Sequence, residues 1–280
     1  MNDVYKIAGI SRQYHHKAEK KGLEDALLWQ RLMEMVLEMR KEYPKSSARK
    51  IHKKLRINEV GINRFEQYVS LQGLSVKRRR SFIKTTHPGP VRYPNLVNGL
   101  EIDNINQLWV SDITYFLTDQ TTFYIVMILD VYSRFIIGYS YSDNLLAVNN
   151  QKALKMAFEL REQKKYDNLI HHSDKGSQYG ANCYTEMLDD AEIEISMAEN
   201  CLENPYAERI NGIIKNDYLI AYKINTLTDL QRAMRKSIML YNNYPHGKLP
   251  HQQSPIEFEE NLRKNSGQSH GIMKLYDFRK

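Results

Sequence analysis

Three carboxylates in well-separated segments of this 280-residue chain could form one site. Asp112 lies in the middle of the apolar segment WVSDITY, where a lone charged side chain is costly unless something offsets it. Asp174 follows a short apolar segment in HHSDKGSQY, and Glu208 opens a helical segment in NPYAERINGIIK. A mid-strand position, a strand end and a helix can deliver carboxylates to one point. Such a set of oxygen ligands suits Mg²⁺, which also binds substrate phosphates.

The segment that carries Glu208 has two different faces when it is read as a helix. Glu208, Asn211, Gly212 and Lys215 recur at i, i+3, i+4 and i+7, and isoleucines occupy the opposite face. The Lys215 ammonium then lies about 10 Å further along the helix axis than Glu208, which is too far for a metal ligand but suitable for a phosphate. Asn211 and Lys215 are therefore candidate contacts of a phosphate-bearing partner. A surface helix with one i, i+7 charge pair is the alternative interpretation.

The elements around these residues alternate between strands and helices. A nearly continuous apolar run at 122–131 is typical of a strand covered on both faces. The order is βββαβαβα, which predicts a mixed sheet flanked by helices. The last clear element is a helix at 228–241. The expected strands are 108–117, 122–131, 134–141, 168–172 and 193–197, and the expected helices are 147–164, 184–191 and one that begins near Tyr206.

Charge separates the first hundred residues from the rest. The net charge is +12 over residues 1–100 and −5 over the remaining 180. Three basic helices are expected at 23–43, 46–55 and 63–71, with Gly73 at a left-handed helix end. This pattern is typical of a helix-turn-helix that contacts DNA, with Lys53 and Arg64 among the candidate contacts. A three-helix unit with a well-solvated surface is the alternative.

Between these parts, residues 77–103 have no periodicity and contain prolines and glycines, as linkers do. Four basic residues open this segment and are expected to contact phosphates. They are Lys77, Arg78, Arg79 and Arg80.

Several classes of protein are excluded by what the sequence lacks. Nucleotide-binding GxxxxGK[ST] and GxGxxG motifs, the GxSxG elbow and the HExxH zinc motif are all absent. Cys183 and Cys201 form no CxxC pair. The longest apolar run, at 123–129, is too short to cross a bilayer, and the N-terminus does not resemble a signal peptide. We therefore expect a cytoplasmic protein.

The motifs WVSDITY, HSDKGSQY and NPYAERINGIIK together resemble the core of DDE transposases related to retroviral integrases. The chain is most similar to the second-reading-frame transposases of the bacterial IS-three insertion-sequence family. DVYSRFIIGYS and YNNYPHGKLPHQQSPIEF also resemble that family. The resemblance is strong over about 94–258, although the Asp174–Glu208 spacing is slightly shorter than is typical and the last motif varies from its usual form.

The resemblance implies a ribonuclease-H-like α/β fold with an all-α N-terminal helix-turn-helix domain. Asp112, Asp174 and Glu208 would be the catalytic residues and would bind two Mg²⁺ or Mn²⁺ ions, with Lys215 near the DNA end. The expected domains are a DNA-binding region at 1–76, a linker at 77–103, a catalytic core at 104–225, and a C-terminal helix and tail at 226–280.

The implied function is cleavage at the ends of a mobile element, followed by strand transfer from a 3′-hydroxyl. The expected partners are double-stranded DNA of the terminal repeats and the target, further copies of the chain on that DNA, and an upstream-frame protein, fused or separate. A bacterial cytoplasmic protein at the nucleoid is expected. The alternatives are a ribonuclease-H-type nuclease that does not join strands and a non-catalytic DNA-binding regulator of transposition.

Overall fold

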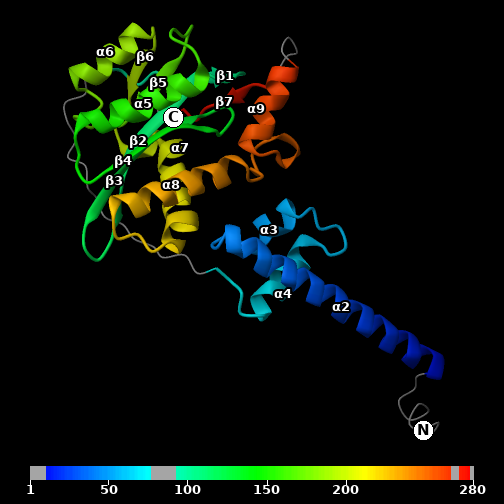
Figure 1. The fold of residues 1–280 in the computed structure, drawn as a ribbon. Helices are drawn as coiled ribbons and strands as arrows, with labels where there is room; N and C mark the ends of the chain where they lie inside the picture. Colours follow the sequence, from blue (N-terminus) through cyan, green and yellow to red (C-terminus); the bar gives the residue numbers. More distant parts are fainter. Residues whose placement is uncertain (1–10, 77–92, 266–270, 278–280) are drawn as a thin grey trace. The chain divides into compact units, whose positions relative to one another are not determined.

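The computed structural model describes residues 11–76, 93–265 and 271–277. The chain divides into two compact units, Met1–Val76 and Lys77–Lys280 (Figure 1). The expected phosphate contacts Lys77, Arg78, Arg79 and Arg80 lie outside the described residues.

The first unit is helical. Its helices are α2 (Arg12–Glu42), α3 (Ala48–Lys54) and α4 (Ile62–Leu71). The expected start of the first helix at residue 23 is wrong, because Ser11 caps the helix through its side chain and the first turns carry no apolar face that periodicity could reveal. Gly73 has a φ of +69°, which confirms the left-handed helix end.

A small apolar core holds the three helices together. Trp29 and Val36 of α2 pack with Ile51 of α3 and with Phe65 and Val69 of α4. The basic side chains of α3 and α4 remain at the surface. This arrangement is a helix pair braced by a long third helix.

The second unit is built on a five-stranded sheet with the order β4-β3-β2-β5-β6. The central strand β2 is antiparallel to β3 and parallel to β5. The sheet with its flanking helices confirms the predicted ribonuclease-H-like class and the order βββαβαβα. The strands are β2 (Leu108–Leu117), β3 (Thr122–Asp130), β4 (Ile136–Ser142), β5 (Ile170–Ser173) and β6 (Glu194–Met197).

Helices cover both faces of this sheet (Figure 1). On one face, α5 (Ala147–Arg161) and α6 (Asn182–Asp190) pack over a core that includes Trp109 of β2. Side chains alternate along a strand, so Asp112 points to the other face, where α7 (Pro205–Ile213) and α8 (Leu227–Asn242) lie. Gly138 of β4 permits close contact with α5, because a Cβ there would lie 2.2 Å from the Ala153 carbonyl oxygen.

The chain after α7 departs from the predicted pattern. The helix widens at η2 (Ile214–Tyr218), a π-helical turn, and tightens at η3 (Leu219–Ala221). The helix predicted at 228–241 is not the last element, because a capping box at Ser254 starts a further helix. The remaining elements are η1 (Cys201–Glu203), η4 (Pro250–Gln252), α9 (Pro255–Lys264) and the paired strands β1 (Glu101–Ile102) and β7 (Met273–Lys274).

Part of the segment expected to be a linker belongs to the second unit and packs against β6. The Leu96 backbone N–H donates to Ser196 Oγ at 2.9 Å, and Val97 and Ile102 are buried. Within the described ranges, none of the helices has the length and apolar character that crossing a membrane requires.

A buried ionic cluster joins α9 to the sheet. Arg161 at the end of α5 lies 3.1 Å from an Asp130 carboxylate oxygen and 2.5 Å from a Glu259 carboxylate oxygen. Ser133 Oγ also donates to Glu259, at 2.5 Å. All three charged side chains are at most 5% exposed, so each charge depends on its partners.

We predict that Arg161→Met destabilises the fold by about 3–5 kcal/mol, because it leaves two buried carboxylates without a cation. Urea unfolding measures the loss. Lys165→Met removes the same charge from an exposed pair with Glu192 and should change stability little. Equal stability of the two variants would show that the cluster does not hold α9 in place.

Candidate active site

Asp112 lies on the central strand β2 and faces α7. Its side chain is half-buried, and its Oδ2 accepts a hydrogen bond of 2.8 Å from Asn211 Nδ2. Asn211 is itself buried. The amide therefore fixes the direction of the carboxylate from the neighbouring helix.

Asp174 follows β5, which runs parallel to β2. Its Oδ1 accepts a hydrogen bond of 3.0 Å from the Gly176 backbone N–H. A Cβ at position 176 would lie 2.9 Å from that oxygen, so glycine is what allows the turn to close around the carboxylate. Beneath the turn, Tyr179 Oη and Ser111 Oγ are 2.8 Å apart, which ties this loop to β2.

Glu208 is in the first turn of α7 and is exposed. The start of this helix is fastened to β2 by Asn204, whose Nδ2 donates to the Ser111 carbonyl oxygen at 2.9 Å. Pro205 then occupies the first helical turn, where its missing N–H costs nothing. One hydrogen bond at each end of α7 thus sets the position of Glu208 against Asp112.

Asp174 and Glu208 both act electrostatically on Asp112. Burial, then the charge of Asp174 and, more weakly, that of Glu208, raise the pKa of Asp112 to about 8, against the hydrogen bonds from the Ile113 backbone and Asn211. Burial also raises the pKa of Asp174 and of Glu208. Such a cluster of like charges favours a bound cation.

The carboxylate oxygens do not form one tight three-ligand cage. Within the described residues, the one set of three potential ligands whose atoms all lie within 4.8 Å of one another is His15, His16 and Glu19 on α2. That set includes an i, i+4 pair and an i, i+3 pair on a solvent-facing helix. The oxygens of Asp112, Asp174 and Glu208 are therefore spaced more widely than the ligand atoms of that set.

Lys215 lies in the π-helical turn that follows α7. Its ammonium is 5.1 Å from the centre of the Tyr115 ring on β2. Burial lowers the pKa of Lys215, and the charge of Asp112 acts in the opposite direction. The expectation of a regular helix as far as this residue is wrong, because the wider turn starts at Ile214, and Lys215 is half-buried beside the carboxylates.

The other expected DNA contacts have different surroundings. Lys53 is exposed on α3. Arg64 of α4 is exposed but lies 5.6 Å from the centre of the Trp29 ring and 3.9 Å from Asp25 Oδ2. Asn211, also expected to contact DNA, donates a hydrogen bond from its Nδ2 to Asp112.

Two histidines close to Asp174 are part of the core. His171 Nε2 is 3.0 Å from Tyr184 Oη, and His172 Nδ1 is 2.8 Å from Ser196 Oγ. Burial lowers the pKa of His171 to about 3 and that of His172 to about 4, so both rings are neutral. The sequence did not reveal these roles or those of Asn204 and Tyr179, because each depends on contacts between distant segments.

Residues 103–200 match the integrase core domain family. A 31 kDa protein of insertion element IS600 from Shigella sonnei is 34% identical over 209 residues, which cover 72% of this chain and 75% of that protein. A putative transposase, InsK, of insertion sequence IS150 from Escherichia coli is 26% identical over 254 residues, 87% of each chain.

Among solved structures, the magnesium-bound catalytic core of HTLV-2 integrase aligns with a TM-score of 0.45 and 19% identity, covering 59% of this chain and 98% of that one. The IS600 relative is matched at a level and over a length that establish the family. This chain therefore belongs to the DDE transposases of the IS-three insertion-sequence family, which are polynucleotidyl transferases.

Proposed function

We propose that Asp112, Asp174 and Glu208 are the catalytic residues of this transposase and hold divalent cations, Mg²⁺ or Mn²⁺. The observation that carries this proposal is that the charges of Asp174 and Glu208 both act on the carboxylate of Asp112. We propose two ions per site, with Asp112, Asp174 and Glu208 as the residues that would hold them. When bound, such ions activate a nucleophilic oxygen and stabilise a leaving oxygen.

The residues of the chain position the reacting groups. Asn211 fixes the Asp112 carboxylate, and the Gly176 N–H fixes that of Asp174. Glu208 comes from a helix that is fastened to the same strand. We propose that the site hydrolyses a phosphodiester at each end of the element and then joins the freed 3′-hydroxyl to target DNA. A ribonuclease-H-type nuclease would cut without joining, and a strand-transfer assay separates the two.

We propose that the basic first unit binds double-stranded DNA, with Lys53 among its contacts and Arg64 as a weaker candidate. Lys53 is exposed on α3, whereas Arg64 is partly occupied by Trp29 and Asp25. A mobile element has two ends, so we also propose that several copies of the chain assemble on the DNA. We also propose that the chain works with a protein from an upstream reading frame, fused or separate. We propose that it acts in the cytoplasm, at the nucleoid.

We predict that Asp112→Asn abolishes Mg²⁺-dependent cleavage and raises the Tm of the metal-free chain. The pKa of Asp112 is raised in the folded state, so its ionisation costs stability increasingly as pH rises from about 4 to about 8. The gain in Tm should therefore be larger at pH 8 than at pH 5, at about 2–4 °C for each kcal/mol relieved.

Calorimetry with and without Mg²⁺ measures these effects, and Asp174→Asn and Glu208→Gln should also remove cleavage. Asp119→Asn, in the exposed turn after β2, is the matched control and should keep both the cleavage and the Mg²⁺-dependent rise in Tm. Cleavage that survives in a folded carboxylate variant would remove that residue from the catalytic set.

We predict that Lys215→Ala lowers strand transfer and binding of the DNA end by about tenfold, the value of one charge-assisted contact. Lys215→Arg should retain most of the binding, because it keeps the charge. The Mg²⁺-dependent shift in Tm should change little, since Lys215 is not a ligand. Lys223→Ala, at an exposed lysine further along the chain, is the control. Wild-type binding and joining by Lys215→Ala would leave this lysine without a role.

A further inference from the structure

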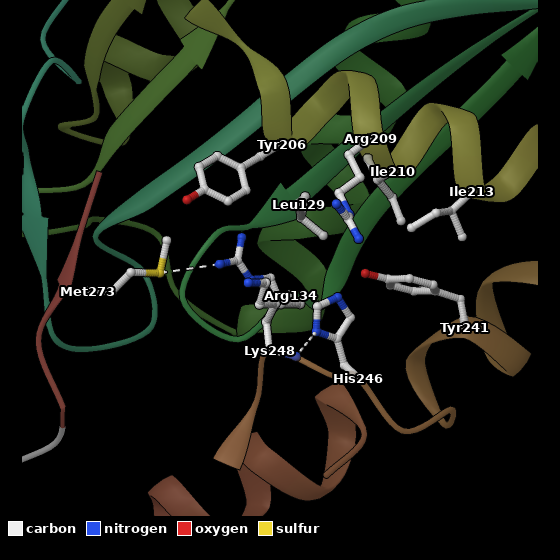
Figure 2. A pocket seen from close by; sticks show the side chains of 10 residues that line it. All are labelled: Leu129, Arg134, Tyr206, Arg209, Ile210, Ile213, Tyr241, His246, Lys248 and Met273. Atoms are coloured by element: carbon white, nitrogen blue, oxygen red, sulfur yellow. Dashed lines mark hydrogen bonds between the residues drawn. The ribbon is translucent and has the colours of Figure 1, made fainter. Parts of the chain in front are cut away.

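A cavity lies along one face of α7 (Figure 2). Its volume is about 230 Å³, and it is lined by α7, α8 and the segment after α8, the turn between β3 and β4, and β7. Basic and aromatic side chains predominate in its lining. Those used below are Arg134, Arg209, Lys248, Tyr206, Tyr241 and His246.

Arg134 is held in place although its backbone is strained. Its φ is +62°, a conformation that favours glycine or asparagine over arginine. The guanidinium lies 4.4 Å from the centre of the Tyr206 ring, and one Nη donates to Met273 Sδ at 3.4 Å. Sulfur is a weak acceptor, so most of the donors of Arg134 remain available. A strained position that keeps a long cationic side chain indicates a use for that side chain.

The positive charge in this cavity is not neutralised by the protein. In the part of the chain that the structure describes, no ion pair with a carboxylate is formed by Arg134, Arg209 or Lys248, in contrast to the buried Arg161. Burial raises the pKa of the Tyr241 phenol, and the charges of Arg134 and Arg209 act in the opposite direction. Both guanidinium groups therefore act on the same point of the cavity wall.

Two sequence motifs that the carboxylates do not use meet at this cavity. Arg134 comes from DVYSRFIIGYS, and His246 and Lys248 come from YPHGKLP. These segments are more than a hundred residues apart and belong to different elements. Because both motifs contribute side chains to one cationic cavity, we infer that they act together there.

We propose that this cavity binds a backbone phosphate of DNA, at a position other than the bond that is cleaved. The proposal rests on the proposed function, in which DNA is the substrate. Two guanidinium groups can each donate two hydrogen bonds to phosphate oxygens, and neighbouring hydroxyl and imidazole groups complete such a site. Arg209 directly follows Glu208, so one turn of α7 presents a catalytic carboxylate on one side and a phosphate contact on the other.

The first test measures binding of duplex DNA to the full chain over a range of NaCl concentrations, without divalent metal. Each phosphate contact contributes about one to the slope of log K against log salt. Arg134→Gln combined with Arg209→Gln should make the slope shallower by about one, and the corresponding double Lys variant should keep it. Lys155→Gln, exposed on α5 across the sheet, is the matched control and should keep the wild-type slope. A wild-type slope in the double Gln variant would overturn the proposal.

The second test uses a milder change, in case the double variant unfolds. Arg209→Cys should attack a mixed disulfide that is tethered to a backbone phosphate of duplex DNA, which releases the small thiol and leaves the protein joined to the DNA, at higher yield than Lys155→Cys. The unmodified chain gives the background from Cys183, which is exposed. Equal yields from the two variants would also overturn the proposal, as would a cavity that binds inorganic phosphate while the DNA slope stays unchanged.

These measurements separate the two proposals. Neither test requires cleavage, so a chain without Mg²⁺-dependent cleavage would contradict the proposed function and leave the cavity test valid. Normal cleavage with unchanged salt dependence and no preferential cross-link would contradict the cavity proposal alone.

Discussion

The attachment of α7 to β2 is the constraint on which the active site depends. Asn204 bonds to the Ser111 carbonyl at the start of the helix, and Asn211 bonds to the Asp112 carboxylate two turns later. Glu208 lies on the helix between these two hydrogen bonds. The separation between the backbone of Glu208 and the backbone of Asp112 is therefore fixed. Both amides are buried, where a lost hydrogen bond leaves an unsatisfied polar group and costs about 1–3 kcal/mol. A shift of the helix along the strand would therefore break these hydrogen bonds and destabilise the fold.

This rigidity has a purpose, because the carboxylates that it holds repel one another. The raised pKa of Asp112 shows that the folded chain disfavours full ionisation of the group. A loose helix would relax by moving Glu208 away, and the three carboxylates would no longer be placed to hold the proposed cations. The apolar core on the opposite face, around Trp109 and α5, supplies the stability that this repulsion removes.

Local patterns were sufficient to predict the sheet and the position of the carboxylates, but not the contacts between segments. The predicted strand at 108–117 matches β2, because its β-branched and aromatic residues have no competing helical period. The pairing of β1 with β7 joins residues far apart in the sequence, and two-residue strands leave no period to detect. The π-helical turn at Ile214 is likewise invisible in a pattern read at 100° per residue, yet it determines where Lys215 lies. Asn204 was not identified, because its role depends on the Ser111 carbonyl, and nothing in the sequence around residue 204 indicates that partner.

The C-terminal region has a role that its position after the core does not indicate. The buried Arg161–Glu259 pair fastens α9 to the sheet, and the turn that follows Asp130 presents Arg134 to the cationic cavity. His246 and Lys248 lie between α8 and α9, so fixing α9 also limits where they can be. The Arg161 guanidinium is buried and paired with carboxylates. The Arg134 guanidinium instead lies beside a cavity and over the Tyr206 ring. Two arginines close to one turn thus serve opposite purposes, one holding the scaffold together and the other facing the space where an anion fits.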